Sequence, residues 1–435
     1  MPVYLVSYII SFILARQHFY MLSGLVLIIA ALWLYYRDYA DSGNIIHLRG
    51  LFCLFFVGGQ GISCFKLSRL QGDWDNMTWL CLGLAVLAFW GVFEVLSRLF
   101  DGWSEDDMES VYRFYASAES PYQVRRILQA MAGLVAVSWL AFAFEAWKLG
   151  FIPLFSYGVP HAYSYFHVSG VHYFTVACVL VPSLSVVYSL MVMRRGRGVT
   201  RSGGFWLAMG FNVLALAIPV LCVSRFQLIL AVGMAVFTYI SMAGNIKPVY
   251  VGILFACMVP AYLLLTVMRS HSVEYLNGIF EMKNANMPIF ITQPYMYIAN
   301  NYDNFNCLVE QLPSHTLGLR MLFPLWAFTG LKFLVPSLVD FPLFVTKKEL
   351  TTVTLFYDAY YDFGMIGMVL FGALLGAACY YLVRGRKKLT CPAGHVIYAQ
   401  IAMYMMLSFF TTWFSNPATW FYLVVTGIIY IFVKS

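Results

Sequence analysis

Three arginines lie at or near the ends of apolar segments, where a phosphate at a membrane surface could be bound. Arg225 opens one apolar run, Arg269 closes another, and Arg320 interrupts an apolar stretch farther along the chain. A guanidinium is always charged and can match a phosphate with two parallel hydrogen bonds. Arginines at outward-facing span ends are less expected than inward ones, which favours function over anchoring for Arg225 and Arg269. We therefore predict that the three arginines bind a diphosphate.

Asp358 and Asp362 follow Thr354 at intervals of four residues. This spacing places all three on one face of a helix that leads into the membrane. Carboxylates inside a membrane are costly and usually functional. Asp358 could merely cap the helix near the water surface, whereas Asp362 lies one turn deeper, so we predict a functional role for Asp362. Gly364, Gly367, Gly372 and Gly376 come next in the sequence, and we predict that these glycines let another helix pack closely.

His161, His167 and His172 follow Glu145 in the sequence. Their intervals of six and five residues fit no helical ligand pair, and no cysteine accompanies them, so we predict no metal centre. Glu145 or a single histidine acting as a base fits this pattern better.

Tyrosine and asparagine side chains are dense between residues 295 and 306. Aromatic faces and amide groups of this kind can stack on sugars and form hydrogen bonds with them. A tyrosine belt at a membrane interface would account for the aromatic residues equally well. The predicted sugar-binding set is Tyr295, Tyr297, Asn301, Tyr302, His167 and Tyr357.

The chain that must position these residues is strongly apolar. Of its 435 residues, 61% are hydrophobic and 11% are charged, and the mean hydropathy is +0.75. Apolar runs recur at lengths near the ~20 residues that cross a bilayer, which predicts an all-α polytopic membrane protein with about 11 or 12 transmembrane helices in one domain, residues 1–435. The predicted spans lie near residues 19–36, 45–66, 78–99, 127–147, 170–193, 204–223, 225–244, 248–267, 354–383, 396–414 and 418–433.

Residues 1–15 are apolar but short, so they form either an interfacial helix or a thin twelfth span. No apolar segment followed by a small-residue cleavage site opens the chain, so nothing suggests that the N-terminus is removed. The nine cysteines lie mostly in apolar runs and predict no disulfide framework.

The two densest basic patches, residues 194–197 and 384–388, should both be cytoplasmic. They fall on the same side only if residues 268–350 contribute no crossing. We therefore predict that residues 317–335, although apolar, are re-entrant or interfacial. The same count places residues 149–169 in a first outer loop and residues 268–350 in a large outer loop.

The large outer loop is predicted to contain two helices. Val273, Leu276 and Phe280 recur at helical spacing opposite a polar face, which is typical of an amphipathic helix on a membrane surface. Pro294 is predicted to begin the second helix and Pro313 to end it.

Four short motifs resemble the O-antigen polymerase (Wzy-type) family of oligosaccharide repeat-unit polymerases. Within residues 144–155, GFIPLF resembles the start of the first large outer loop of that family, and Ser224-Arg225 resembles its span-opening arginine. The segments YIANNYDNF (297–305) and TTVTLFYDAYYDFGMIG (351–367) resemble its aromatic and asparagine segment and its late glycine-containing span. Each motif is short and degenerate, and the resemblance covers the chain from about residue 140 onward.

The resemblance implies a C-type, polyprenyl-phosphate-dependent glycosyltransferase in the bacterial inner membrane, with its active site facing the periplasm or the cell exterior. Such enzymes need no metal, cofactor or nucleotide sugar. Undecaprenyl-diphosphate-linked oligosaccharide serves as both donor and acceptor, membrane lipid and a separate chain-length regulator are further partners, and no nucleic acid takes part. Within this scheme, Arg225, Arg269 and Arg320 would stabilise the diphosphate leaving group. His271, Glu145 and Asp362, in that order, are candidate general bases.

Three other functions remain as alternatives. An O-antigen ligase shares the same arginine and histidine chemistry, and only the late Tyr-Asp-Phe-Gly span favours a polymerase. A flippase or transporter of lipid-linked oligosaccharide is disfavoured by the large outer loop and by the lack of repeats and of midplane charges. A structural membrane scaffold would need neither Arg225 nor Asp362.

Overall fold

Every regular element in the described part of the chain is helical. The computed structural model describes residues 1–100, 121–156, 162–194, 203–244, 246–247, 249, 252, 273–284, 286–386, 389 and 391–434. One isolated β-bridge joins Ser68 to Met282. The all-α prediction is confirmed for these residues.

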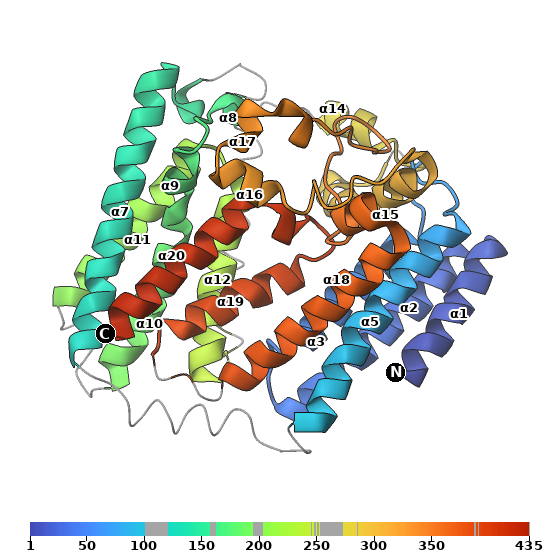
Figure 1. Cartoon of the computed structure of the whole chain (residues 1–435), viewed down its shortest axis with the longest axis horizontal. Coiled ribbons are helices and arrows are strands. Elements are labelled where there is room, and N and C mark those ends of the chain that lie inside the picture. Colours follow the sequence, from blue (N-terminus) through green and yellow to red (C-terminus); the bar gives the residue numbers. More distant parts are fainter. Residues whose placement is uncertain are drawn as a thin grey trace. The chain divides into compact units, whose positions relative to one another are not determined.

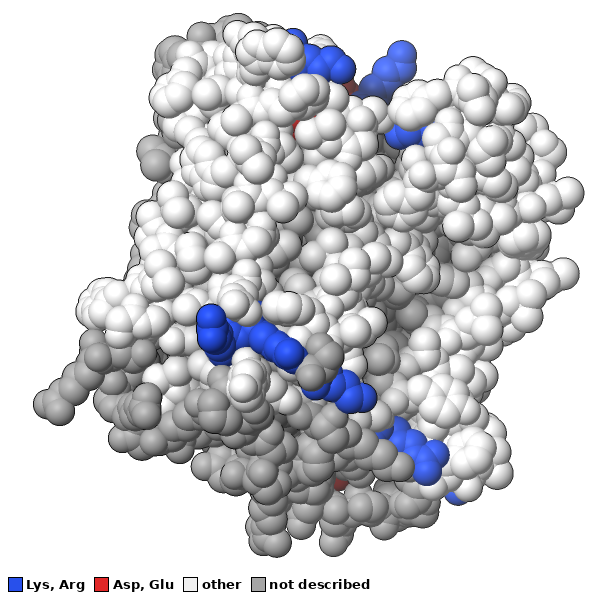
Figure 2. Space-filling view, turned by 60° about the vertical axis from the view of Figure 1, so that its left-hand side comes forward, with Lys and Arg blue, Asp and Glu red and all other residues white. Residues whose placement is uncertain are grey.

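Eight helical segments of the described chain are long and apolar enough to cross a membrane. They are α2 (Tyr20–Ser42), α5 (Asn76–Phe100), α7 (Pro121–Leu149), the segment His172–Met193 within α9, η3 and α10, α11 (Gly203–Leu221), α12 (Arg225–Ala243), α18 (Tyr357–Arg386) and α20 (Pro417–Lys434). Figure 2 shows a face on which most of the described side chains are uncharged. The chain is therefore built as a polytopic membrane protein.

Most predicted spans coincide with these helices, and two differ. The span predicted over residues 396–414 is the shorter helix α19 (Gly394–Met406) of 13 residues. After Met406 the chain continues as turns, with hydrogen bonds from Ser408 N to Met405 O (3.3 Å) and from Phe410 N to Leu407 O (3.0 Å), and the Ser408 carbonyl accepts from Leu355 N (2.8 Å). The span predicted over residues 45–66 is one shorter continuous helix, Leu48–Ser63, in which the π-helix η1 (Cys53–Val57) lies between α3 (Leu48–Phe52) and α4 (Gly58–Ser63). The span predicted over residues 248–267 falls almost entirely outside the described residues.

The chain forms two compact units, each assembled from separated segments. Unit 1 comprises Met1–Asp106, Ser272–Arg384 and Tyr404–Trp420, and unit 2 comprises Asp107–His271, Gly385–Met403 and Phe421–Ser435. Unit 1 therefore contains α1 (Pro2–Arg16), α2 to α5, most of the predicted large outer loop and α18. In unit 2, α7 packs against α10 (Val181–Arg194), which also contacts α11 and α12.

Within unit 1, α1, α2, α5 and α18 run side by side in Figure 1, with α14 (Val273–Phe280) and α15 (Ile289–Gln311) near their upper ends. The contact between α5 and α18 depends on glycine. A Cβ at Gly372 would lie 2.7 Å from Ala85 O, and one at Gly376 would lie 2.2 Å from Phe89 O. These distances confirm the prediction that Gly372 and Gly376 serve close helix packing.

Replacing Gly376 with alanine should destabilise unit 1. The new Cβ would overlap the Phe89 carbonyl, and overpacking of this kind costs about 1–3 kcal/mol. Gly91→Ala is the matched control, because a Cβ there meets nothing within 4 Å and alanine is the better helix former. Thermal unfolding in detergent should show a lower midpoint for Gly376→Ala alone. Equal midpoints for the two variants would contradict this packing.

The predicted large outer loop packs inside unit 1. The prediction that Pro294 begins its second helix is wrong, because α15 begins at Ile289 and contains Pro294 internally. Pro294 is the sixth residue of α15 and has no N–H, so the intrahelical hydrogen bond to Phe290 O cannot form there. The helix ends at Gln311, before Pro313 as predicted.

The other parts of this loop also form short helices. The amphipathic helix predicted from residue 273 is present as α14, and Leu276 and Phe280 belong to a hydrophobic cluster with Tyr295. Packing against the protein therefore accounts for at least part of its apolar face. Residues 317–335 contain α16 (Phe323–Phe328) and α17 (Leu331–Leu334), which are six and four residues long. Neither is long enough to cross the ~30 Å hydrocarbon core.

Candidate functional site

Helix α18 is interrupted at Gly364, where φ is 61° and ψ is −145°. A residue with a side chain rarely adopts this φ, and a Cβ here would lie 2.8 Å from the Nε2 atom of His315. Near the break, the carbonyls of Tyr361 and Asp362 accept hydrogen bonds from Thr316 N (3.3 Å) and Leu317 N (3.1 Å). The loop that precedes α16 is thus attached to the broken turn of α18.

The Asp362 side chain fixes the same loop. Its carboxylate is fully buried and accepts hydrogen bonds from Met321 N (2.8 Å), from Arg320 N (3.2 Å) and from the Thr316 hydroxyl. Three donors from one loop fully engage this carboxylate. Asp362 therefore holds the backbone that carries Arg320.

Arg320 is held between a carboxylate and two aromatic rings. Its Nε donates to Asp358 Oδ1 over 2.7 Å, and its guanidinium carbon lies 4.4 Å from the ring centre of Tyr361 and 5.7 Å from that of Tyr357. The side chain is 17% exposed. Burial acts to lower the pKa of Arg320, but the neighbouring Asp358 carboxylate raises it, and the resulting pKa lies above the ordinary value. The result is a permanently charged, oriented guanidinium whose charge is paired with that of Asp358.

A cavity of about 450 Å³ opens beside this cation. Arg320 and Asp358 line it together with polar side chains of the segment before α20, namely Thr412, Ser415 and Asn416. The remaining wall is mostly apolar and is formed by Leu319, Phe323, Leu338, Val339, Phe341, Leu343 and Pro417. A charged and polar wall facing an apolar wall suits an amphiphilic ligand with an anionic head.

Three tyrosines of the predicted sugar-binding set, Tyr295, Tyr302 and Tyr357, are buried in unit 1, and the Tyr357 hydroxyl donates to Phe344 O over 2.9 Å. The Tyr302 side chain is fully buried and donates to Phe56 O over 2.6 Å. Tyr295 is 7% exposed and donates to Gln71 Oε1 over 2.6 Å. Their hydroxyls and ring faces are already used within the protein.

The asparagines of α15 tie this helix to neighbouring segments. Asn301 donates to Tyr297 O and Phe409 O, both over 2.7 Å, and its side-chain oxygen accepts from the Thr352 hydroxyl over 2.6 Å. Asn304 Nδ2 donates to the carbonyls of Leu350 and Thr352. Backbone anchoring therefore accounts for this amide-rich segment. Tyr297, at the same helix, is half-buried and packs near Phe410.

Sequence reasoning missed a charged group at the centre of unit 1. Asp303 accepts hydrogen bonds of 2.7 Å from each of Lys66 Nζ, Gln71 Nε2 and Trp74 Nε1, and one of 3.2 Å from Ser63. Lys66 and Asp303 are 5% and 3% exposed. Four donors around a buried carboxylate indicate a structural ion pair.

The remaining predicted residues that the structure describes belong to unit 2. Glu145 is fully buried and accepts from Val168 N (2.9 Å) and from the Thr175 hydroxyl (2.7 Å), and its Oε2 lies 3.1 Å from His172 Nδ1. His167 is exposed, and its ring packs edge-on against His172. Glu145 thus joins the end of α7 to the segment that contains α9 (His172–Val176).

Arg225 opens α12 as predicted and is 7% exposed. Arg269 and His271 lie outside the described residues. The predicted site residues that the structure brings together are therefore Arg320, Tyr357 and Asp362. Within the described ranges, no three His, Cys, Asp or Glu side chains gather in a way that would hold a metal ion.

Comparison of the chain with protein families, curated proteins and solved structures found no significant match in any of the three. The chemistry of the cavity beside Arg320 is thus the main guide to function.

Proposed function

We propose that the protein is a polymerase that joins undecaprenyl-diphosphate-linked oligosaccharide repeat units into a surface polysaccharide. In this proposal the growing glycan leaves its lipid carrier and is transferred onto the next lipid-linked unit. The reaction takes place at the outer face of a bacterial inner membrane.

The strongest support is the cavity beside Arg320. The substrate proposed here combines a diphosphate, a sugar chain and a long apolar prenyl chain. The cavity offers a fixed guanidinium, hydroxyl and amide groups at Thr412, Ser415 and Asn416, and an apolar wall that includes Phe323. The lining therefore includes a group of each kind that the diphosphate head of such a substrate and its nearest neighbours would contact.

Arg320 would act on the leaving group. The bond between the anomeric carbon of the donor sugar and its diphosphate oxygen breaks, and both electrons leave with the diphosphate. A cation already in position stabilises the charge that develops there, at no cost in reorganisation. Asp358 and Tyr361 hold the guanidinium in one orientation, so we assign them positioning roles.

The acceptor hydroxyl forms the new bond to the anomeric carbon and gives its proton to a general base. Of the predicted bases, Asp362 is engaged by three donors of one loop, and we assign it to positioning Arg320. Glu145 is similarly engaged by backbone, hydroxyl and imidazole groups. His271, the first of the predicted bases, lies outside the described residues.

The proposal can be tested with purified protein in detergent, supplied with the lipid-diphosphate repeat unit and a metal chelator. We expect a ladder of glycan products on a gel, spaced by one repeat unit. Transfer of a finished glycan as one block onto a lipid A core would indicate a ligase. Failure to form any glycosidic product, with protein that melts cooperatively and substrate that a known polymerase accepts, would contradict the proposal.

A further inference from the structure

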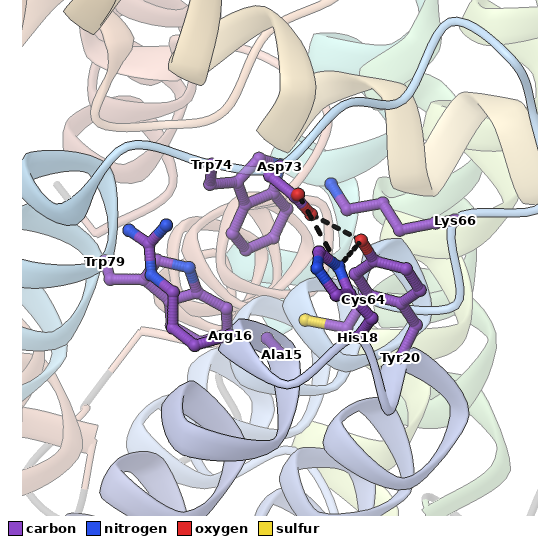
Figure 3. Close-up of a pocket in the computed structure, with 9 residues that line it drawn as sticks. All are labelled: Ala15, Arg16, His18, Tyr20, Cys64, Lys66, Asp73, Trp74 and Trp79. Atoms are coloured by element: carbon purple, nitrogen blue, oxygen red, sulfur yellow. Dashed lines mark hydrogen bonds and ion pairs between the residues drawn. The ribbon is translucent and has the colours of Figure 1, made fainter.

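A second, smaller cavity of unit 1 lies at the turn between α1 and α2 (Figure 3). Its volume is about 270 Å³, and Arg16, Lys66 and Asp73 contribute its charged lining. Lys66 is neutralised by Asp303 over 2.7 Å. Arg16 contacts the Asn76 amide oxygen and stacks on Phe12, and neither group carries a negative charge. Among the residues that the structure describes, Arg16 therefore has no carboxylate partner.

Asp73 supplies the opposite charge in the same cavity. It accepts from the Tyr20 hydroxyl over 2.6 Å, and the Tyr20 oxygen lies 2.7 Å from His18 Nδ1. These three side chains point toward one another in Figure 3. The Asp73 side chain is 50% exposed, so it can accept a further donor. The cavity thus presents one cation and one accessible carboxylate.

An apolar groove of about 320 Å³ adjoins this cavity along α1 and α5. Trp79 lines both the cavity and the groove. Arg16 of the cavity lining also contacts Asn76 of the groove lining. Leu5, Ile9, Leu84 and Leu87 are among the residues along the groove. Helix α1 has 15 residues and is about 22 Å long, so it is shorter than the ~30 Å hydrocarbon core.

We propose that unit 1 holds a membrane phospholipid with an ammonium headgroup, such as phosphatidylethanolamine. An acyl chain lies in the groove between α1 and α5, the phosphate contacts Arg16, and the ammonium contacts Asp73. The apolar groove, the Arg16 cation and the Asp73 carboxylate come in the same order as the acyl chain, the phosphate and the ammonium of such a lipid. This site is distinct from the cavity beside Arg320.

Native mass spectrometry of delipidated protein in detergent tests the site, with phosphatidylethanolamine and phosphatidylglycerol of identical chains as probes. Wild-type protein should bind the first phosphatidylethanolamine up to about fivefold more tightly, because an exposed charge pair contributes at most ~1 kcal/mol. Asp73→Asn should abolish this preference. Equal first-site affinities of the wild-type protein for the two lipids would overturn the assignment of the headgroup.

Two further variants test the phosphate contact and the groove. Arg16→Gln should weaken binding of both lipids by up to about fivefold, because Arg16 is exposed as well, whereas Arg69→Gln, an exposed arginine outside the cavity lining, should not. Ile9→Trp should block the groove, and Ile13→Trp, at similar exposure on the same helix but outside the groove lining, should not. Variants Arg16→Gln and Ile9→Trp that bind both lipids as tightly as their controls would overturn the proposal.

Discussion

Replacing Arg320 with alanine is expected to slow glycan polymerisation about 100- to 1,000-fold, the range seen when one preorganised donor to a developing negative charge is removed. The guanidinium is fixed by Asp358 and by the ring of Tyr361 at the wall of the cavity. Arg320 is the arginine that lines the cavity in which the proposed reaction would take place. The measurement is the initial rate of ladder formation by purified protein at saturating substrate.

Matched variants separate this role from simple destabilisation. Arg320→Lys keeps the charge but loses the planar fork and the Nε contact to Asp358, so it should restore only part of the rate. Lys348→Ala removes an exposed cation from the same segment and should leave the rate unchanged. An Arg320→Ala protein with a normal thermal midpoint and a normal rate would exclude this arginine from the reaction.

The positions of most helices follow from the lengths of the apolar runs. Residues 78–99 and 418–433 are predicted spans that α5 and α20 contain. The break of α18 at Gly364 was not predictable, because the glycine is compatible with a straight helix until the loop at His315 is placed against it. A local sequence pattern thus predicts that a helix is present, but it does not predict a break that depends on a contact with a distant loop.

The candidate site was predictable only in part. The four-residue interval between Asp358 and Asp362 correctly places them near each other, since both contact Arg320. The prediction that Thr354 shares their helix face is wrong, because α18 begins at Tyr357. The tyrosines and asparagines of α15 were interpreted as sugar ligands because their composition is the same for a binding surface and for a buried set of hydrogen bonds. Their partners, such as Phe56 for Tyr302 and Thr352 for Asn301, lie far away in sequence.

The ion pair of Lys66 and Asp303 shows the same limit most clearly. The two residues are 237 positions apart, and neither lies in a charged motif. The pair joins the segment after α4 to the middle of α15, while the Lys66 ammonium also lies 4.1 Å from the ring centre of Trp74. Burial of both charges makes this contact a strong test of how unit 1 is held together.

Replacing Asp303 with alanine is expected to lower the free energy of unfolding by about 3–5 kcal/mol, because the Lys66 ammonium would remain buried without its counter-charge. The change also removes the acceptor for Gln71 and Trp74. The measurement is the free energy of unfolding in detergent, with Trp fluorescence as the probe. Loss of a cooperative melting transition would also show the destabilisation. A loss below about 1 kcal/mol would mean that water reaches the pair and screens it.

A double-mutant cycle distinguishes the ion pair from general damage to the core. Lys66→Met and Asp303→Leu together remove both charges, so the double variant should be less destabilised than the sum of the single variants, with a coupling of about 1–3 kcal/mol. Trp74→Phe is a milder control, since it removes one hydrogen bond to Asp303 but leaves the ammonium paired. Strictly additive effects would show that the two charges do not stabilise each other, and that the other donors around Asp303 hold α15 in place.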